Sequence, residues 1–120
     1  MADVLAYLAG ALVATWGVFH VVPTTRVLDG FEPISVDNRR VLAQEWVAEA
    51  VTMWGIATFV IVGTALHLGG IDWLYRLAAG ILVVLGVLTT FTGARTAIVW
   101  FKVCVGLLGV SAALLAVASA

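Results

Sequence analysis

The sequence predicts an all-α protein: a four-helix transmembrane bundle with up-down antiparallel topology, forming a single integral membrane domain over residues 1–120. The first observation is composition, with 63% hydrophobic and 11% charged residues. Soluble domains have about 45–50% and about 25% respectively. A soluble chain of 120 residues is mostly surface and has too little interior to bury so much apolar area. We therefore expect lipid to surround most of the chain.

The second observation is the length of the apolar segments. A helix needs about 20 residues to span a bilayer, and the sequence contains four apolar segments of about that length, at 4–22, 47–68, 74–91 and 97–118. The region 23–46 is expected to be a surface loop that leads into the interfacial start of the second helix. Short turns separate the last three segments, so sequence neighbours are expected to be antiparallel neighbours in space.

The ends of the first two helices can be placed more closely. Pro23 is expected to end the first helix, because proline lacks the N–H that continues a helix. Ser35 or Asp37 can cap the second helix, because each has a side-chain oxygen that accepts from unpaired backbone N–H groups. That helix is therefore expected to begin near Val36 and to enter the bilayer after Trp46. The first segment lacks the basic region of a signal peptide and is expected to be a transmembrane helix.

Positive charge is distributed unequally between the two ends of the predicted bundle. Arg76 alone lies at one end, and the other end carries Arg26, Arg39, Arg40, Arg95 and Lys102. The positive-inside rule assigns the more basic end to the cytoplasm. Both termini are then expected outside the cytoplasm, with the protein in a bacterial or archaeal cytoplasmic membrane.

At helical spacing, each predicted helix places small and polar residues on one side. The four stripes are Gly10, Val13, Gly17 and His20; Glu45, Glu49, Thr52, Ile56 and Gly63; Ala79, Val83, Gly86 and Thr90; and Arg95, Val99, Lys102, Gly106, Gly109 and Ala113. Small residues allow bilayer helices to approach closely, so we expect the stripes to face one another. Most of their polar groups fall in one leaflet, which predicts a polar pocket or ionic network that opens toward the cytoplasm.

The candidate ligand-binding residues are the polar and tryptophan side chains of that leaflet: Trp16, His20, Glu45, Glu49, Thr52, Thr90, Trp100 and Lys102. His20 and Glu49 are also a candidate acid/base pair, since imidazole and carboxylate are common proton-transfer groups. Each candidate has a structural interpretation as well. Glu49 can pair with Lys102 and join the second helix to the fourth, because a charge at that depth must pair or lose its proton. The tryptophans can be packing or interfacial residues.

Several kinds of site are not predicted. No close His/Cys cluster suggests a metal site, and Cys104 is expected to be a small packing residue. His20 and His67 fall at opposite ends of the bundle, so they cannot together ligate one haem in a monomer. No cofactor is expected. The net charge of -1, with no basic cluster beyond Arg39 and Arg40, gives no reason to expect nucleic-acid binding.

In size, four-helix layout and a charged entry to the second helix, between Asp37 and Glu49, the chain resembles small bacterial membrane proteins of the DoxX-like kind. The placement of His20 and Glu49 beside tryptophans is also similar to sterol-binding EXPERA-type bundles. Both resemblances cover the whole chain and rest on layout. No diagnostic motif accompanies them, so no functional residue is carried over from either family.

Three functional classes follow from these observations. The favoured one is a protein, or accessory subunit, that binds a lipid, quinone or similar apolar molecule in the cytoplasmic-leaflet pocket. The second is an intramembrane isomerase or cyclase that uses His20 and Glu49 as acid and base. The third is a structural or transport subunit of an oligomeric membrane complex, in which a row of Ala112, Ala116 and Ala120 faces a second chain.

Overall fold

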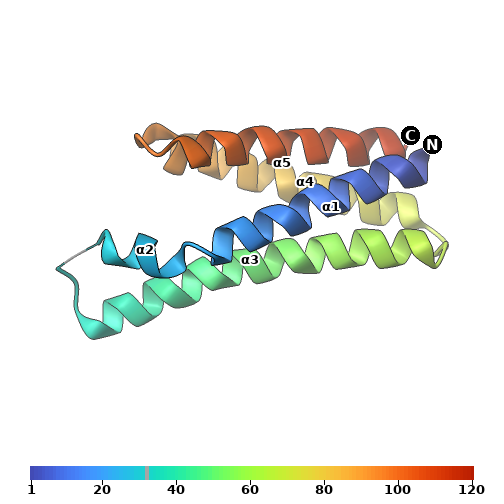
Figure 1. The fold of residues 1–120 in the computed structure, drawn as a ribbon. Helices are drawn as coiled ribbons and strands as arrows, with labels where there is room; N and C mark the ends of the chain where they lie inside the picture. Colours follow the sequence, from blue (N-terminus) through green and yellow to red (C-terminus); the bar gives the residue numbers. More distant parts are fainter. Residues whose placement is uncertain (32) are drawn as a thin grey trace.

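The computed structural model describes residues 1–31 and 33–120 and confirms the predicted all-α bundle (Figure 1). Four long helices run antiparallel to their neighbours in the chain, and both termini lie at the same end. The elements are α1 (Ala2–Val21), α2 (Thr24–Asp29), α3 (Val36–Ala65), α4 (Ile71–Phe91), the 3₁₀ turn η1 (Gly93–Arg95) and α5 (Val99–Ala118).

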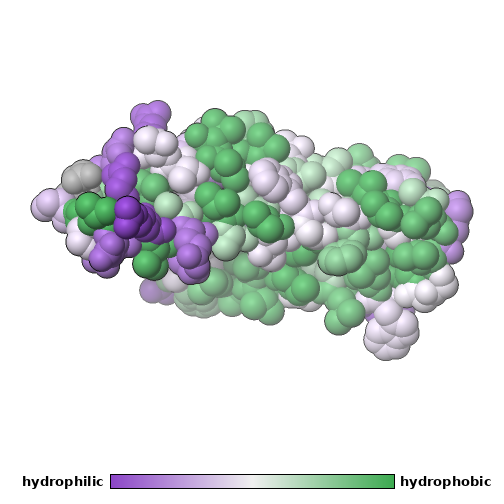
Figure 2. Space-filling view, turned by 90° about the horizontal axis from the view of Figure 1, so that it is seen from below, coloured by the Kyte–Doolittle hydropathy of each residue, from purple (hydrophilic) through white to green (hydrophobic). Residues whose placement is uncertain are grey.

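The four long helices are long and apolar enough to cross a membrane, which indicates a multi-pass membrane protein. Helix α3 has 30 residues and is therefore about 45 Å long, whereas the hydrocarbon core is about 30 Å thick. About ten of its residues must then extend beyond the hydrocarbon. Hydrophilic residues gather at the end of the molecule that carries α2 and the start of α3, whereas the middle of the face in view is mostly hydrophobic (Figure 2). We refer to this end as the polar end.

The predicted start of α3 is confirmed. The helix begins at Val36, and the hydroxyl of its N-cap residue Ser35 accepts a hydrogen bond from the backbone N–H of Asn38 at 3.1 Å. Helix α1 ends at Val21, shortly before Pro23, as predicted. The region after Pro23 was expected to be a loop, but it contains α2, in which Leu28 is buried. Because α2 packs against α3, it covers the part of α3 that extends from the bundle.

Helix α1 is the centre of the packing. It lies against both α3 and α5, while α4 packs mainly on α5, and α3 and α4 touch little although they are consecutive. The predicted α1 stripe is confirmed, because its four members are all buried: Gly10, Val13, Gly17 and His20. On α3, the expected members Ile56 and Gly63 are buried, but Thr52 is exposed. The stripe positions on α4 divide in the same way, with Ala79 and Gly86 buried and Val83 and Thr90 exposed.

The predicted stripe of α5 was wrong. Lys102, Gly106 and Gly109 are exposed, and a Cβ atom added at either glycine would have no neighbour within 4 Å. The buried face instead contains Cys104, Leu108, Ser111, Ala112, Leu115 and Ala118. The physical reason is the packing against α1 and α4: Leu108 and Leu115 fill the space between the helices, and the other buried positions of α5 are small enough for close approach. Leu108, for example, packs over Gly86.

Candidate functional site

His20 is held in the last turn of α1 at the polar end of the bundle. It is only 5% exposed. Its backbone carbonyl belongs to the last turn of α1, where carbonyls have no intrahelical donor. The indole N–H of Trp46 donates to this carbonyl at 2.6 Å. The Trp46 ring also stacks on the imidazole, with ring centroids 4.1 Å apart and planes inclined by 14°. One α3 residue therefore fixes both the backbone and the side chain of His20.

Glu49 follows Trp46 on the same face of α3, one turn deeper in the bundle. Its Oε2 atom lies 3.3 Å from Nε2 of His20. This distance is short enough for an ion pair. The geometry is not that of a hydrogen bond, and the buried Nε2 atom has no hydrogen-bond partner among the described residues. We regard the contact as a close approach of polar groups rather than an aligned hydrogen bond. The Glu49 side chain remains 36% exposed on its other side.

The expected ion pair between Glu49 and Lys102 is not formed. Lys102 lies on the exposed face of α5 and has no ion pair with any residue of the described ranges. The partner of Glu49 is His20, so this contact joins α3 to α1 instead of to α5. The reason is that the buried face of α5 contains Cys104, whereas Lys102 lies on its exposed face.

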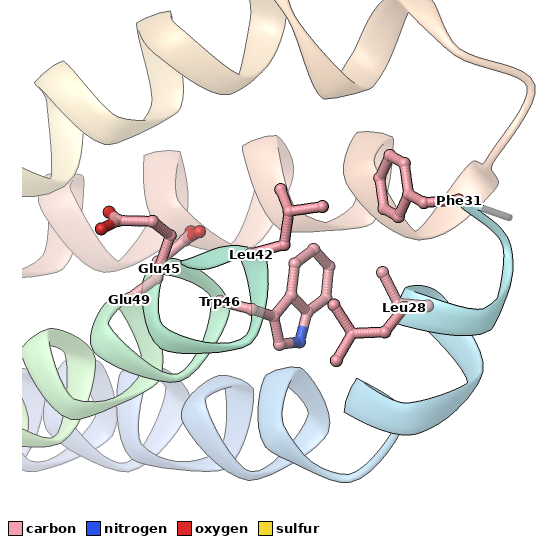
Figure 3. Close-up of a pocket in the computed structure, with 7 residues that line it drawn as sticks. Leu28, Phe31, Leu42, Glu45, Trp46 and Glu49 are labelled. Atoms are coloured by element: carbon pink, nitrogen blue, oxygen red, sulfur yellow. The ribbon is translucent and has the colours of Figure 1, made fainter. Parts of the chain in front are cut away.

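A small hollow of about 170 Å³ adjoins Glu49 at the polar end. The residues that line it come from α2, the turn after α2, and α3: Val27, Leu28, Phe31, Leu42, Glu45, Trp46 and Glu49. Figure 3 shows the indole of Trp46 and the side chains of Leu28 and Leu42 between α2 and α3. The carboxylates of Glu45 and Glu49 lie at the edge opposite Phe31. The hollow therefore has an apolar body and an acidic edge.

Helix α5 supports this site from the other side. The ring of Phe101 meets Trp46 edge-on, with centroids 6.4 Å apart and an interplanar angle of 82°, an arrangement that aromatic pairs favour. Phe101 lies so close to η1 that a Cβ atom at Gly93 would come 2.5 Å from its ring. Glycine at position 93 therefore allows the Phe101 ring to approach.

The structure brings three of the sequence candidates to this site: His20, Glu45 and Glu49. Trp16 is buried in the core, and Trp100 is 65% exposed. The hydroxyls of Thr52 and Thr90 donate to carbonyls of their own helices, those of Ala48 and Gly86 respectively. These threonines, Trp100 and Lys102 are exposed and do not line the hollow.

Sequence reasoning missed the role of Trp46, which was interpreted as an interfacial residue, and the contribution of α2. A signal for Trp46 was present, since it precedes Glu49 by three residues and so shares its helix face. No comparable signal marked Leu28 and Phe31, because their positions depend on how α2 folds back onto α3. Across the described part of the chain, no group of three or more His, Cys, Asp or Glu residues could hold a metal ion.

Comparison with known proteins gives no further identification: no family model, curated protein or solved structure matches this chain. The resemblance to DoxX-like and EXPERA-type proteins therefore remains one of layout. The function has to be argued from the site itself.

Proposed function

We propose that this membrane protein binds a small amphipathic molecule in the hollow beneath α2, either as a binding protein or as an accessory subunit. The observation that carries this proposal is the lining of the hollow, which combines apolar side chains with two carboxylates. Small-molecule sites have this composition, with mostly hydrophobic walls and a few polar groups that set orientation. At about 170 Å³, the hollow has room for a head group and the first few carbons of a chain. Leu28, Phe31 and Leu42 would contact the apolar body of the ligand, and Glu45 and Glu49 its polar head.

The position of the hollow supports the same proposal. It lies where hydrophilic residues gather and where α3 extends from the predicted hydrocarbon region. An amphipathic molecule that partitions into the bilayer has its polar head at this depth. The ligand could therefore reach the hollow from the membrane without its head crossing the hydrocarbon core, where charged groups are costly.

The approach of His20 to Glu49 favours the intramembrane enzyme as a second candidate. In that function, the pair would transfer protons to and from a bound substrate. The geometry supports binding better, because His20 is buried and is not among the residues that line the hollow. A molecule recovered chemically altered from the wild type, but unaltered from Glu49→Gln, would support the enzyme.

Native mass spectrometry of the protein released from its own membranes tests the proposed binding. We expect a discrete adduct on the wild type and about a tenfold weaker adduct on Glu49→Gln, because a charged hydrogen-bond acceptor is lost. Asp72→Asn is the matched control, since Asp72 is an exposed carboxylate in the first turn of α4, at the opposite end of the bundle. It should keep the adduct. Absence of any adduct from all three proteins would contradict the proposal and favour a structural subunit.

We further propose that the polar end faces the cytoplasm and that both termini lie outside it, as the positive-inside rule predicts. Cys104 is the chain's single cysteine, so Cys104→Ala provides a background for added cysteines. In intact cells, a membrane-impermeant maleimide should label Ala120→Cys and not Thr25→Cys, which lies on α2 at the opposite end. Labelling of Thr25→Cys but not of Ala120→Cys would show that the orientation is the opposite of the proposed one.

A further inference from the structure

We infer that the head group bound in the hollow is a cation, such as the amine or quaternary ammonium of an amphipathic molecule. This inference rests on the proposed function and specifies its ligand. The charged side chains among the described residues of the lining are Glu45 and Glu49, and both are acidic. When both carboxylates are ionised, His20 can supply at most one positive charge, so the three side chains keep a net negative charge. Such a site favours a cation.

The two carboxylates are not neutralised by the arginines nearby in sequence. Arg39 pairs with Asp29 on α2, and Arg40 approaches Asp37 on its own helix at 3.7 Å. Glu45 forms no ion pair with any residue that the structure describes. Glu45 and Glu49 are four residues apart on α3, where like charges destabilise a helix. A cation bound between them would offset this repulsion.

Aromatic rings give a second reason to expect a cation. Trp46 and Phe31 both line the hollow, and the faces of aromatic rings attract ammonium groups, tryptophan most strongly. The indole of Trp46 is held in place by its stacking on His20 and by its hydrogen bond to the His20 carbonyl. The ring is therefore fixed before a ligand binds, which lowers the entropic cost of binding.

The same lining disfavours heads that accept hydrogen bonds, such as a quinone carbonyl or a carboxylate. Such heads need donors. The indole N–H of Trp46 already donates to the His20 carbonyl, and the other described lining side chains are carboxylates or hydrocarbons. The oxygen atoms of a quinone or of an anionic lipid head accept hydrogen bonds, and in the hollow they would face the carboxylate oxygens of Glu45 and Glu49, which are also acceptors. The oxygen atoms of the head would then have no hydrogen-bond donor.

Three amphiphiles of equal chain length test the inference: dodecylammonium, dodecanol and dodecanoate. Each is added at the same concentration to the purified full chain in maltoside micelles, and the bound fraction is measured by native mass spectrometry. We expect the wild type to bind dodecylammonium about tenfold more than either other amphiphile. Glu45→Gln should lower this preference severalfold, and Glu45 is exposed, so the fold should tolerate the change. The double variant Glu45→Gln/Glu49→Gln should abolish the preference, and Asp72→Asn should keep it.

A further variant, Leu42→Trp, separates the possible failures by filling the hollow. If dodecanol or dodecanoate binds as well as the cation, and Leu42→Trp prevents this binding, the cation inference is overturned while the proposed function stands. If Leu42→Trp affects none of the amphiphiles, both fail. A preference for the cation that persists in the double Gln variant would show ion pairing elsewhere on the surface and would also overturn the inference.

Discussion

Replacing Trp46 with alanine is expected to destabilise the bundle by about 2–4 kcal/mol, slightly less than the roughly 3–5 kcal/mol for a fully buried tryptophan, because Trp46 is only partly buried. Three contacts are lost at once: the stacking on His20, the hydrogen bond to the His20 carbonyl and the edge contact with Phe101. These contacts link α3 to both α1 and α5. In lipid, helix association depends on such packing and hydrogen bonds rather than on the hydrophobic effect. The measurement is unfolding by SDS in mixed micelles, followed by circular dichroism.

Two variants show whether the loss comes from these contacts. Trp46→Phe keeps a ring to stack on His20 but removes the N–H donor, so it should cost about 1 kcal/mol. Trp100→Ala removes a tryptophan that is 65% exposed and should change stability by less than about 0.5 kcal/mol. Equal destabilisation by Trp46→Ala and Trp100→Ala would contradict the account of Trp46.

Gly17→Leu is expected to separate α1 from α3 and to lower the free energy of unfolding by about 1–3 kcal/mol, as overpacking does in a close-packed interior. Gly17 is buried, and a Cβ atom there would come 2.5 Å from Nε1 of Trp54. The Trp54 ring would have to move, and its hydrogen bond to the carbonyl of Ala14, at 3.1 Å, would be lost. The unfolding assay described for Trp46 measures this loss.

Gly109→Leu is the matched control for Gly17→Leu. Gly109 is also a helical glycine, but a Cβ atom added there has no neighbour within 4 Å. Because glycine is a poor helix former, this change should be neutral or stabilising by up to about 1 kcal/mol. Trp54→Ala combined with Gly17→Leu should recover part of the loss. If Gly17→Leu is as stable as Gly109→Leu, the close approach of α1 and α3 at Gly17 is wrong.

The helices and their order could be predicted from the sequence because lipid imposes a simple condition. Only a long apolar helix satisfies its own backbone hydrogen bonds in hydrocarbon, so segment length and composition locate each span. Caps are equally local, and Ser35 begins α3 where predicted. The approach of His20 to Glu49 also followed in part, because antiparallel order places the end of the first long helix beside the start of the second.

The rotation of each helix about its axis could not be predicted as reliably. A helix in lipid is apolar on all sides, so its hydrophobic pattern does not identify the inner face. Small residues were used instead, and they identified the inner face of α1 but not that of α5, where Gly106 and Gly109 are exposed. Small residues therefore occur on outer faces as well as inner ones, and their position alone does not identify the inner face.

The hollow depended on two further features that sequence patterns do not fix. The path of the chain after Pro23 brings α2 onto α3, although α2 has only six residues and little signal of its own. The pairing of Glu49 with His20, rather than with Lys102, followed from the rotation of α5. His20, Glu45 and Glu49 thus lie close together, but the sequence did not identify His20 as the partner of Glu49.

The most direct test of the account is photo-crosslinking from the hollow in living cells. A benzophenone amino acid replaces Phe31, an exposed aromatic residue that lines the hollow, or Phe59, an exposed phenylalanine of α3 outside it, and the cells are irradiated before purification. The account predicts one discrete small-molecule adduct from position 31, which Glu49→Gln diminishes, and only a mixture of bulk lipids from position 59. The same mixture of bulk lipids from both positions, unaffected by Glu49→Gln, would contradict the claim that the hollow is a binding site.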